Sequence, residues 1–90
     1  MPNSYTSEHP LDVVLSKSQA RGFERLILVT LAWLQDDKDE VVVSVTELAK
    51  ASTTSNGSVV NAIKALEDRG EIQVVHGHGH VKNRYRVTVS

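Results

Sequence analysis

The hydrophobic period of the chain changes at Gly70, and this change limits the folds that the chain can adopt. From Val59 to Leu66 the apolar residues have the spacing of one buried helix face. After Gly70, a residue type that commonly ends helices, apolar and polar residues alternate over 72–76 and again over 84–89. Two alternating segments joined by a glycine-containing loop predict an antiparallel hairpin. We therefore expect a helix that leads directly into a C-terminal hairpin.

A long helix is predicted nearer the start of the chain, over residues 16–36, with Ser16 or Ser18 as its N-cap. Its expected buried face consists of Ala20, Phe23, Ile27, Leu31 and Leu34. A second apolar stripe lies about 120° further round the helix. We expect this stripe to meet either the apolar segment at residues 11–15 or a second copy of the chain. Its members are Leu26, Val29 and Trp33.

The middle of the chain contains a short β-like run at residues 41–43 and two helix-start signals. Ser44 and Glu47 have the spacing of a capping box, in which each side chain binds the other residue's backbone amide. This box predicts a helix over about residues 45–51. After a polar break at residues 52–54, Ser55 is expected to cap the helix that ends at Gly70.

The composition is that of one small domain. The chain has 90 residues, of which 40% are hydrophobic and 23% charged, and it has no cysteine. Disulfides and cysteine-ligated metal sites are therefore excluded. The longest strongly apolar run, residues 26–34, is about half of a membrane span, and residues 1–10 lack the basic and apolar regions of a secretory signal. We expect a cytoplasmic protein with no membrane contact, with an N-terminal arm over residues 1–15 and one domain over residues 16–90.

Charge is distributed unevenly along the chain. Residues 1–49 have four basic and eight acidic side chains, whereas residues 50–90 have six basic and three acidic ones. A basic second half suits a polyanionic partner on one face of the domain. Ordinary scatter over a solvated surface is the alternative at this magnitude.

Two segments of the chain, VTELAKA at residues 45–51 and SNGSVVNAIKALEDRGEI at residues 55–72, resemble the helix-turn-helix of bacterial winged-helix DNA-binding proteins. MarR-like and GntR-like regulators are the best-known members. Residues 83–87, NRYRV, are also similar to the second wing strand of winged-helix modules in plasmid and phage replication proteins. The resemblance covers residues 17–89. It implies an α+β, mainly α, winged helix-turn-helix fold with a three-helix core and a C-terminal β-hairpin wing.

In such families the third helix enters the major groove of DNA. The resemblance therefore assigns base and phosphate recognition to the outward positions at the helix start. Asparagine presents a donor and an acceptor together, which fits the edge of adenine, and serine with free helix-start amides can hold a phosphate. Helix capping by the serine and a simply solvated helix surface are the alternative interpretations. The predicted recognition residues are Ser55, Asn56, Gly57, Ser58, Val60, Asn61 and Lys64.

The hairpin tip is the second predicted contact region, on the DNA backbone or in the minor groove. A solvated hairpin is the alternative. His76, His78 and His80 alternate as metal-binding imidazoles do on one strand face, but Gly77 and Gly79 make such a site flexible, so we expect no metal and no other cofactor. The predicted wing contacts are His78, His80, Lys82, Asn83, Arg84 and Arg86.

Two features depart from the family pattern. Thr53 stands where the turn often has glycine, and a threonine in a left-handed conformation costs about 1 kcal/mol. The recognition-helix start lacks Arg and Lys, so affinity must come from the wing, a dimer or several copies.

We found no catalytic pattern, and the carboxylates of residues 36–40 match no calcium loop, so we do not expect an enzyme. The predicted function is sequence-specific binding of double-stranded DNA by a small transcriptional regulator, such as a repressor, or by a plasmid or phage accessory factor. The predicted assembly is a homodimer through Leu26, Val29 and Trp33. The alternative is a protein-interaction module of a replication, partition or transcription complex, for which binding would depend far less on salt.

Overall fold

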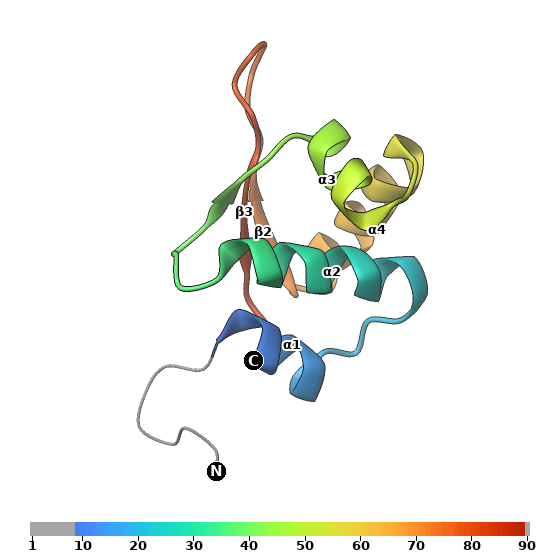
Figure 1. Cartoon of the computed structure of the whole chain (residues 1–90), viewed down its shortest axis with the longest axis vertical. Coiled ribbons are helices and arrows are strands. Elements are labelled where there is room, and N and C mark those ends of the chain that lie inside the picture. Colours follow the sequence, from blue (N-terminus) through green and yellow to red (C-terminus); the bar gives the residue numbers. More distant parts are fainter. Residues whose placement is uncertain (1–8, 90) are drawn as a thin grey trace.

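The computed structural model describes residues 9–89, which form four helices and a three-stranded antiparallel sheet (Figure 1). The fold is therefore α+β and mainly helical, as predicted, and its element order is compatible with a winged helix. The elements are α1 (Pro10–Lys17), α2 (Gly22–Gln35), β1 (Val41–Val42), α3 (Val45–Ser52), α4 (Asn56–Asp68), β2 (Ile72–Val75) and β3 (Arg84–Val87).

Helix α1 corrects the predicted boundary between arm and domain. Pro10 stands at the first helical position, where its missing N–H costs nothing, and the His9 Nδ1 accepts a hydrogen bond from the Leu11 amide at 3.0 Å. Val14 is fully buried where α1 packs on α2. Residues 10–15 therefore belong to the packed domain, and a fourth helix joins the expected three. Residues 1–8 of the predicted arm lie outside the described part of the chain.

The prediction of a single helix over residues 16–36 is wrong, because α1 ends at Lys17 and α2 begins only at Gly22. Ser18 ends α1 instead of starting α2, and the N-cap of α2 is Arg21, whose side chain makes no capping hydrogen bond. Gly22, expected inside the helix, has φ +60°, a conformation that favours glycine and that turns the chain as α2 begins.

Helix α2 is the centre of the fold, and Figure 1 shows it between α1 on one side and α3 and α4 on the other. Because α2 is packed on both sides, its buried face covers a wider arc of the helix than the sequence predicted. This buried face does not include Phe23, which is 60% exposed. Leu34, also expected inside, is only half-buried. The fully buried residues of α2 are Ile27, Leu28, Leu31 and Ala32.

The sheet has the strand order β1-β3-β2, so β3 is its central strand. Tyr85 of β3 faces Val41 on one side and Val74 on the other, and it is 1% exposed. Burial raises the pKa of the Tyr85 phenol, although the hydrogen bond that Asn83 Nδ2 donates to its oxygen at 3.1 Å acts in the opposite direction. The predicted hairpin and the predicted β-like run are both confirmed.

The start of α3 and the start of α4 are capped as predicted. The Ser44 hydroxyl accepts from the Glu47 amide at 3.0 Å, and the Glu47 carboxylate accepts from the Ser44 amide at 2.9 Å. The Ser55 hydroxyl accepts from the Ser58 amide at 3.1 Å. Thr53 adopts the left-handed conformation, with φ 57° and ψ 45°. The buried face of α4 is also as predicted, with Val59, Ala62, Ile63 and Leu66 turned inward.

Candidate nucleic-acid interface

The outward face at the start of α4 is the first candidate region. The buried face directs Val59 and Ala62 into the core, so the side chains between them must point to solvent. Val60 is 50% exposed, and only Ser58 of the predicted recognition set is half-buried. The exposed members are Ser55, Asn56, Gly57, Val60, Asn61 and Lys64.

These residues differ in how free their polar groups are. The Ser55 hydroxyl caps the helix and also donates to the Ser58 hydroxyl at 3.0 Å. The Asn56 Nδ2 donates to the Thr46 Oγ1 at 3.3 Å, which joins the starts of α4 and α3. Asn61, by contrast, makes no hydrogen bond to any of residues 9–89. Within residues 9–89, the amide of Asn61 is therefore free to bind another molecule.

The hairpin tip, defined here as residues 76–83, is the second candidate region. It projects well beyond the helices (Figure 1). Asn83 holds its base closed, because its Oδ1 accepts from the Gly77 amide at 2.8 Å while its Nδ2 binds Tyr85. Gly77 lies so close to the Val81 backbone that no side chain fits there. Asn83, predicted as a DNA contact, is thus half-buried and shapes the tip from within.

The cations near the hairpin are paired with acidic or carbonyl groups, which the sequence did not reveal. Lys82 Nζ lies 2.8 Å from Glu47 Oε1, and Arg84 Nη1 lies 3.6 Å from Glu40 Oε1. Arg86 Nε donates to the Asp39 backbone oxygen at 3.1 Å. Pairing of β1 with β3 brings these acidic residues to the hairpin. The β-like run at residues 41–43 was therefore the one sequence signal from which these pairs could have been predicted, by placing it as a third strand beside the hairpin.

Glu47 is held ionised by its neighbours. Its pKa is lowered to about 2, first because the Lys82 ammonium donates to the carboxylate and then because the Ser44 amide and hydroxyl bind it. The side chains of Glu47 and Lys82 are 51% and 47% exposed. An ion pair this exposed contributes little to stability and can exchange partners readily.

A groove connects the two candidate regions. Lys64 of α4 and His76 at the end of β2 both line it, so the outward face of α4 and the hairpin lie side by side. Much of its wall is apolar. The lining residues are Val45, Val60, Ile63, Lys64, Glu67, His76, Asn83 and Tyr85.

The tip histidines do not form a cluster. Within residues 9–89, no group of three or more His, Asp or Glu side chains is placed to hold a metal ion. His78 and His80 are exposed at the end of the tip, where their imidazoles are accessible to another molecule.

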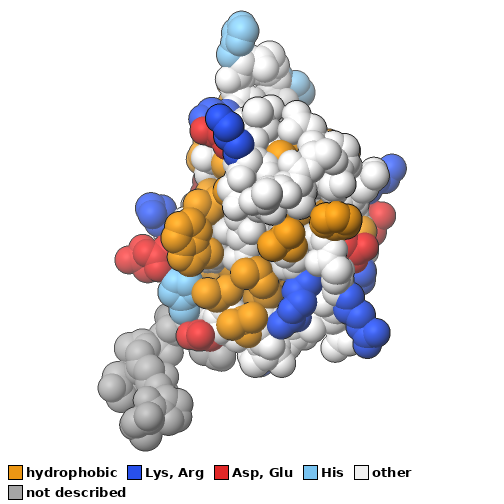
Figure 2. All heavy atoms as spheres, turned by 45° about the vertical axis from the view of Figure 1, so that its right-hand side comes forward, with side chains coloured by type: hydrophobic (Ala, Val, Ile, Leu, Met, Phe, Trp, Pro, Cys, Tyr) orange, Lys and Arg blue, Asp and Glu red, His pale blue; other side chains and the backbone are white. Residues whose placement is uncertain are grey.

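A separate surface lies on α1 and α2. Figure 2 shows hydrophobic side chains gathered over these helices. Leu15 is 54% exposed, Leu26 40% and Trp33 64%, while Val29 is half-buried. Two of the three residues predicted to contact a second copy are therefore exposed.

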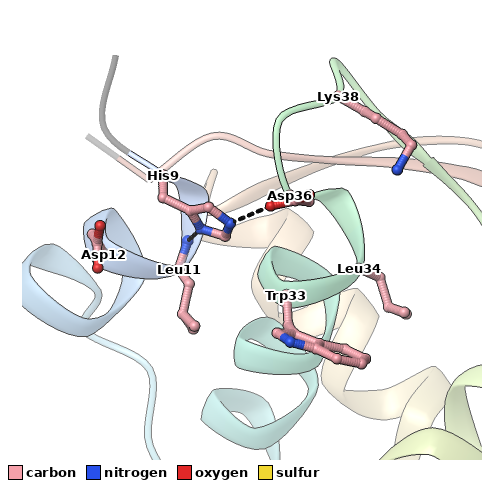
Figure 3. A pocket seen from close by; sticks show the side chains of 7 residues that line it. All are labelled: His9, Leu11, Asp12, Trp33, Leu34, Asp36 and Lys38. Carbon is pink, nitrogen blue, oxygen red and sulfur yellow. Dashed lines mark hydrogen bonds and ion pairs between the residues drawn. The ribbon is translucent and has the colours of Figure 1, made fainter. Parts of the chain in front are cut away.

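Beside Trp33 the surface is hollowed (Figure 3). The His9 Nε2 lies 2.7 Å from the Asp36 Oδ1 across this depression, which fixes the Asp36 carboxylate at its rim. The residues that line the depression are His9, Leu11, Asp12, Trp33, Leu34, Asp36 and Lys38.

No helix within residues 9–89 has the length and apolar character needed to cross a membrane. A comparison of the chain with protein-family models, with curated proteins and with solved structures finds no match.

Proposed function

We propose that the chain is a winged helix-turn-helix domain that binds double-stranded DNA with sequence preference. In this proposal the start of α4 enters the major groove, and the hairpin acts as the wing on the backbone or in the minor groove. The observation that carries the proposal is the position of Asn61 and Lys64, which are exposed on α4 beside the groove that leads to the hairpin. The corresponding role is that of a small cytoplasmic regulator or a plasmid or phage accessory factor.

The dimensions and chemistry of α4 suit a major groove. Thirteen helical residues extend over about 20 Å, and the groove of B-DNA admits one helix. The free amide of Asn61 offers a donor and an acceptor to one adenine edge, while the exposed methyls of Val60 suit a thymine methyl. The Ser55 hydroxyl and the unpaired amides of the first turn face a backbone phosphate.

The ion pairs of the hairpin are compatible with this role because they exchange partners at low cost. A DNA phosphate offers Lys82 and Arg84 the same kind of charge-assisted contact as Glu47 and Glu40 do now. Each exchange leaves a carboxylate near the DNA, so binding is expected to be weaker than for a wing whose cations are unpaired. This makes several copies on one DNA molecule, or a dimer, important for affinity.

A second candidate function is favoured by one observation, the apolar wall of the groove between α4 and the hairpin. Val45, Val60 and Ile63 line it, while Lys82 and Arg84 of the hairpin are paired with Glu47 and Glu40. Such a groove suits an apolar side chain from a protein partner in a replication, partition or transcription complex.

Selection of bound duplexes from a random pool by the full chain tests the proposal. Enrichment of a defined sequence, with affinity that falls steeply as salt is raised, is the expected result. No enrichment, together with binding of a protein partner that changes little with salt, would exclude DNA recognition and support the docking function. The same selection with the Gln73→Ala variant, altered at an exposed β2 position that faces away from the core, serves as the matched control.

A further inference from the structure

The outer face of α2 exposes several large apolar side chains to solvent. Phe23, Leu26 and Trp33 are 60%, 40% and 64% exposed. With Thr30 they fall within an arc of about 80° on the helix, so they form one continuous stripe. Large exposed aromatic side chains in a row are typical of an interface with another protein.

The two ends of this stripe have opposite charge. Helices α1 and α2 run antiparallel, because a short turn joins the end of α1 to the start of α2 while His9, before α1, binds Asp36, after α2. This arrangement gathers Lys17, Arg21 and Arg25 at one end and Asp12, Asp36 and Asp37 at the other. Figure 2 shows basic side chains beside one end of the apolar patch and acidic and histidine side chains beside the other.

A surface with an apolar middle and oppositely charged ends is complementary to itself under a two-fold rotation. Two α2 helices can lie antiparallel so that they cross at the level of residue 28 along their axes. In this register Phe23 faces Trp33 of the second copy, and Leu26 faces Thr30. Along the helix axis, the same register brings Arg21 to the level of residues 35 and 36 of the second copy, where the Asp36 carboxylate is exposed. One register therefore opposes apolar residues to apolar residues and brings the basic end of each helix to the level of the acidic end of the other.

The depression beside Trp33 offers a site for this arginine. Its rim carries the Asp36 carboxylate, held by His9, and the Asp12 carboxylate, against the single ammonium of Lys38 (Figure 3). A guanidinium there can pair with a carboxylate and lie over the indole ring of Trp33. Among residues 9–89, Arg21 has no carboxylate partner of its own.

We propose that the chain forms a two-fold homodimer through antiparallel α2 helices, with Arg21 of each copy inserted into the depression beside Trp33 of the other. This inference does not depend on DNA binding. It concerns a face formed by α1 and α2, whereas the proposed DNA contacts come from α4 and the hairpin.

Sedimentation of the full chain over a concentration series tests the assembly. The chain is expected to be dimeric at about 100 μM, and Trp33→Ala is expected to weaken the dimer at least about tenfold. Val81→Ala, at an equally exposed apolar position on the hairpin tip, is the control and leaves the dimer unchanged. A monomeric chain at this concentration, or a dimer that Trp33→Ala leaves intact, overturns the proposal.

Charge reversal tests the register. In an Arg21→Glu homodimer, a glutamate faces the acidic depression at both of the symmetric contacts. In an Asp12→Lys homodimer, Arg21 faces the added lysine at both contacts. Each variant alone is therefore expected to dimerise about tenfold less tightly. In a mixture of the two variants, both contacts of the heterodimer are between opposite charges, and dimerisation is restored. As the charge-matched control, Lys50→Glu, exposed on α3, replaces Arg21→Glu in the mixture, and it is not expected to restore dimerisation with Asp12→Lys. Failure of the mixture to restore the dimer overturns the antiparallel register. Thermal unfolding of each variant that matches the original chain at a concentration low enough for both to be monomeric shows that the fold is intact.

Discussion

The buried carboxylate of Glu71 accepts a hydrogen bond at 2.6 Å from the hydroxyl of Ser18, a residue 53 positions earlier in the chain. The same carboxylate accepts from the Gln19 amide at 3.1 Å, and the Glu71 side chain is 10% exposed. The backbone of Glu71 is also bound on both sides, to Leu66 and to Thr88. This residue therefore joins the turn between α1 and α2 to the start of the sheet.

Glu71→Ala is expected to lower the free energy of unfolding by about 1–3 kcal/mol, because the Ser18 hydroxyl and the Gln19 amide lose their acceptor. Glu71→Gln keeps one acceptor oxygen and is expected to cost less. Denaturant unfolding of the variants measures the difference. Glu67→Ala, at an exposed position of α4, is the control, and an equal loss for Glu67→Ala would mean that the Glu71 contacts do not stabilise the turn.

The Glu71 contacts also explain which part of the fold the sequence could predict. Capping by Ser44 and Ser55 depends on residues only three positions away, so the starts of α3 and α4 were predicted correctly. The turn between α1 and α2 is also held by the contacts of Glu71 with Ser18 and Gln19, which no pattern near Ser18 reveals. The exposure of Phe23 has the same kind of cause, because α1 folds back over α2 and changes which face is buried.

The candidate site shows the same division. The outward direction of Asn61 follows from the local helix period and was predictable. The partners of Lys82 and Arg84 come from residues 47 and 40, which lie far away in the chain. Only the pairing of β1 with β3 brings them to the hairpin, and a strand as short as Val41–Val42 gives a weak sequence signal.

Thr53→Gly is expected to raise the free energy of unfolding by up to about 1 kcal/mol. Thr53 has φ 57°, where a β-branched residue is strained and glycine is not, although glycine also gains freedom in the unfolded chain. Thermal or denaturant unfolding measures the change. The neighbouring Thr54→Gly is the control and is expected to destabilise, because Thr54 Oγ1 lies 2.9 Å from the Ser52 Oγ. Destabilisation by both changes would show that the left-handed turn carries no strain.

The free energy of unfolding is expected to decrease by a small amount as the pH is lowered and Glu47 is protonated, small because the ion pair is exposed to solvent. The folded-state pKa of Glu47 is about 2, below its ordinary 4.5, so the folded protein binds this proton less tightly than the unfolded chain does. The contribution of Glu47 is therefore complete above about pH 4.5 and is lost as the pH falls toward 2. NMR titration measures the pKa directly.

The variant Lys82→Met isolates the cause of this shift. Removal of the ammonium is expected to move the Glu47 pKa back toward 4.5, and Glu47→Gln is expected to flatten the pH dependence of unfolding between these values. An unchanged Glu47 pKa in Lys82→Met would assign the shift to the Ser44 contacts alone.

Under the proposed function, Arg84→Ala is expected to weaken binding to every duplex and to reduce the slope of log affinity against log salt by about one unit. The reason is that Arg84, 51% exposed on its side chain, is assigned to a phosphate and not to a base. Fluorescence anisotropy over a salt series measures both quantities. Lys50→Ala, at an exposed position of α3, is the matched loss of one positive charge, and an equal effect of Lys50→Ala would show that net charge alone is responsible.

Asn61→Ala separates reading of bases from general attraction to DNA. Because the Asn61 amide is exposed and makes no bond within residues 9–89, its removal is expected to leave folding unchanged. Affinity for the selected duplex is expected to fall by about 1–3 kcal/mol, while affinity for random duplex stays nearly the same. Competition binding with both duplexes measures this ratio. Lys64→Ala, one turn further along α4, provides the contrast, since loss of a phosphate contact lowers both affinities together. If Asn61→Ala also lowers both affinities equally, Asn61 does not read a base.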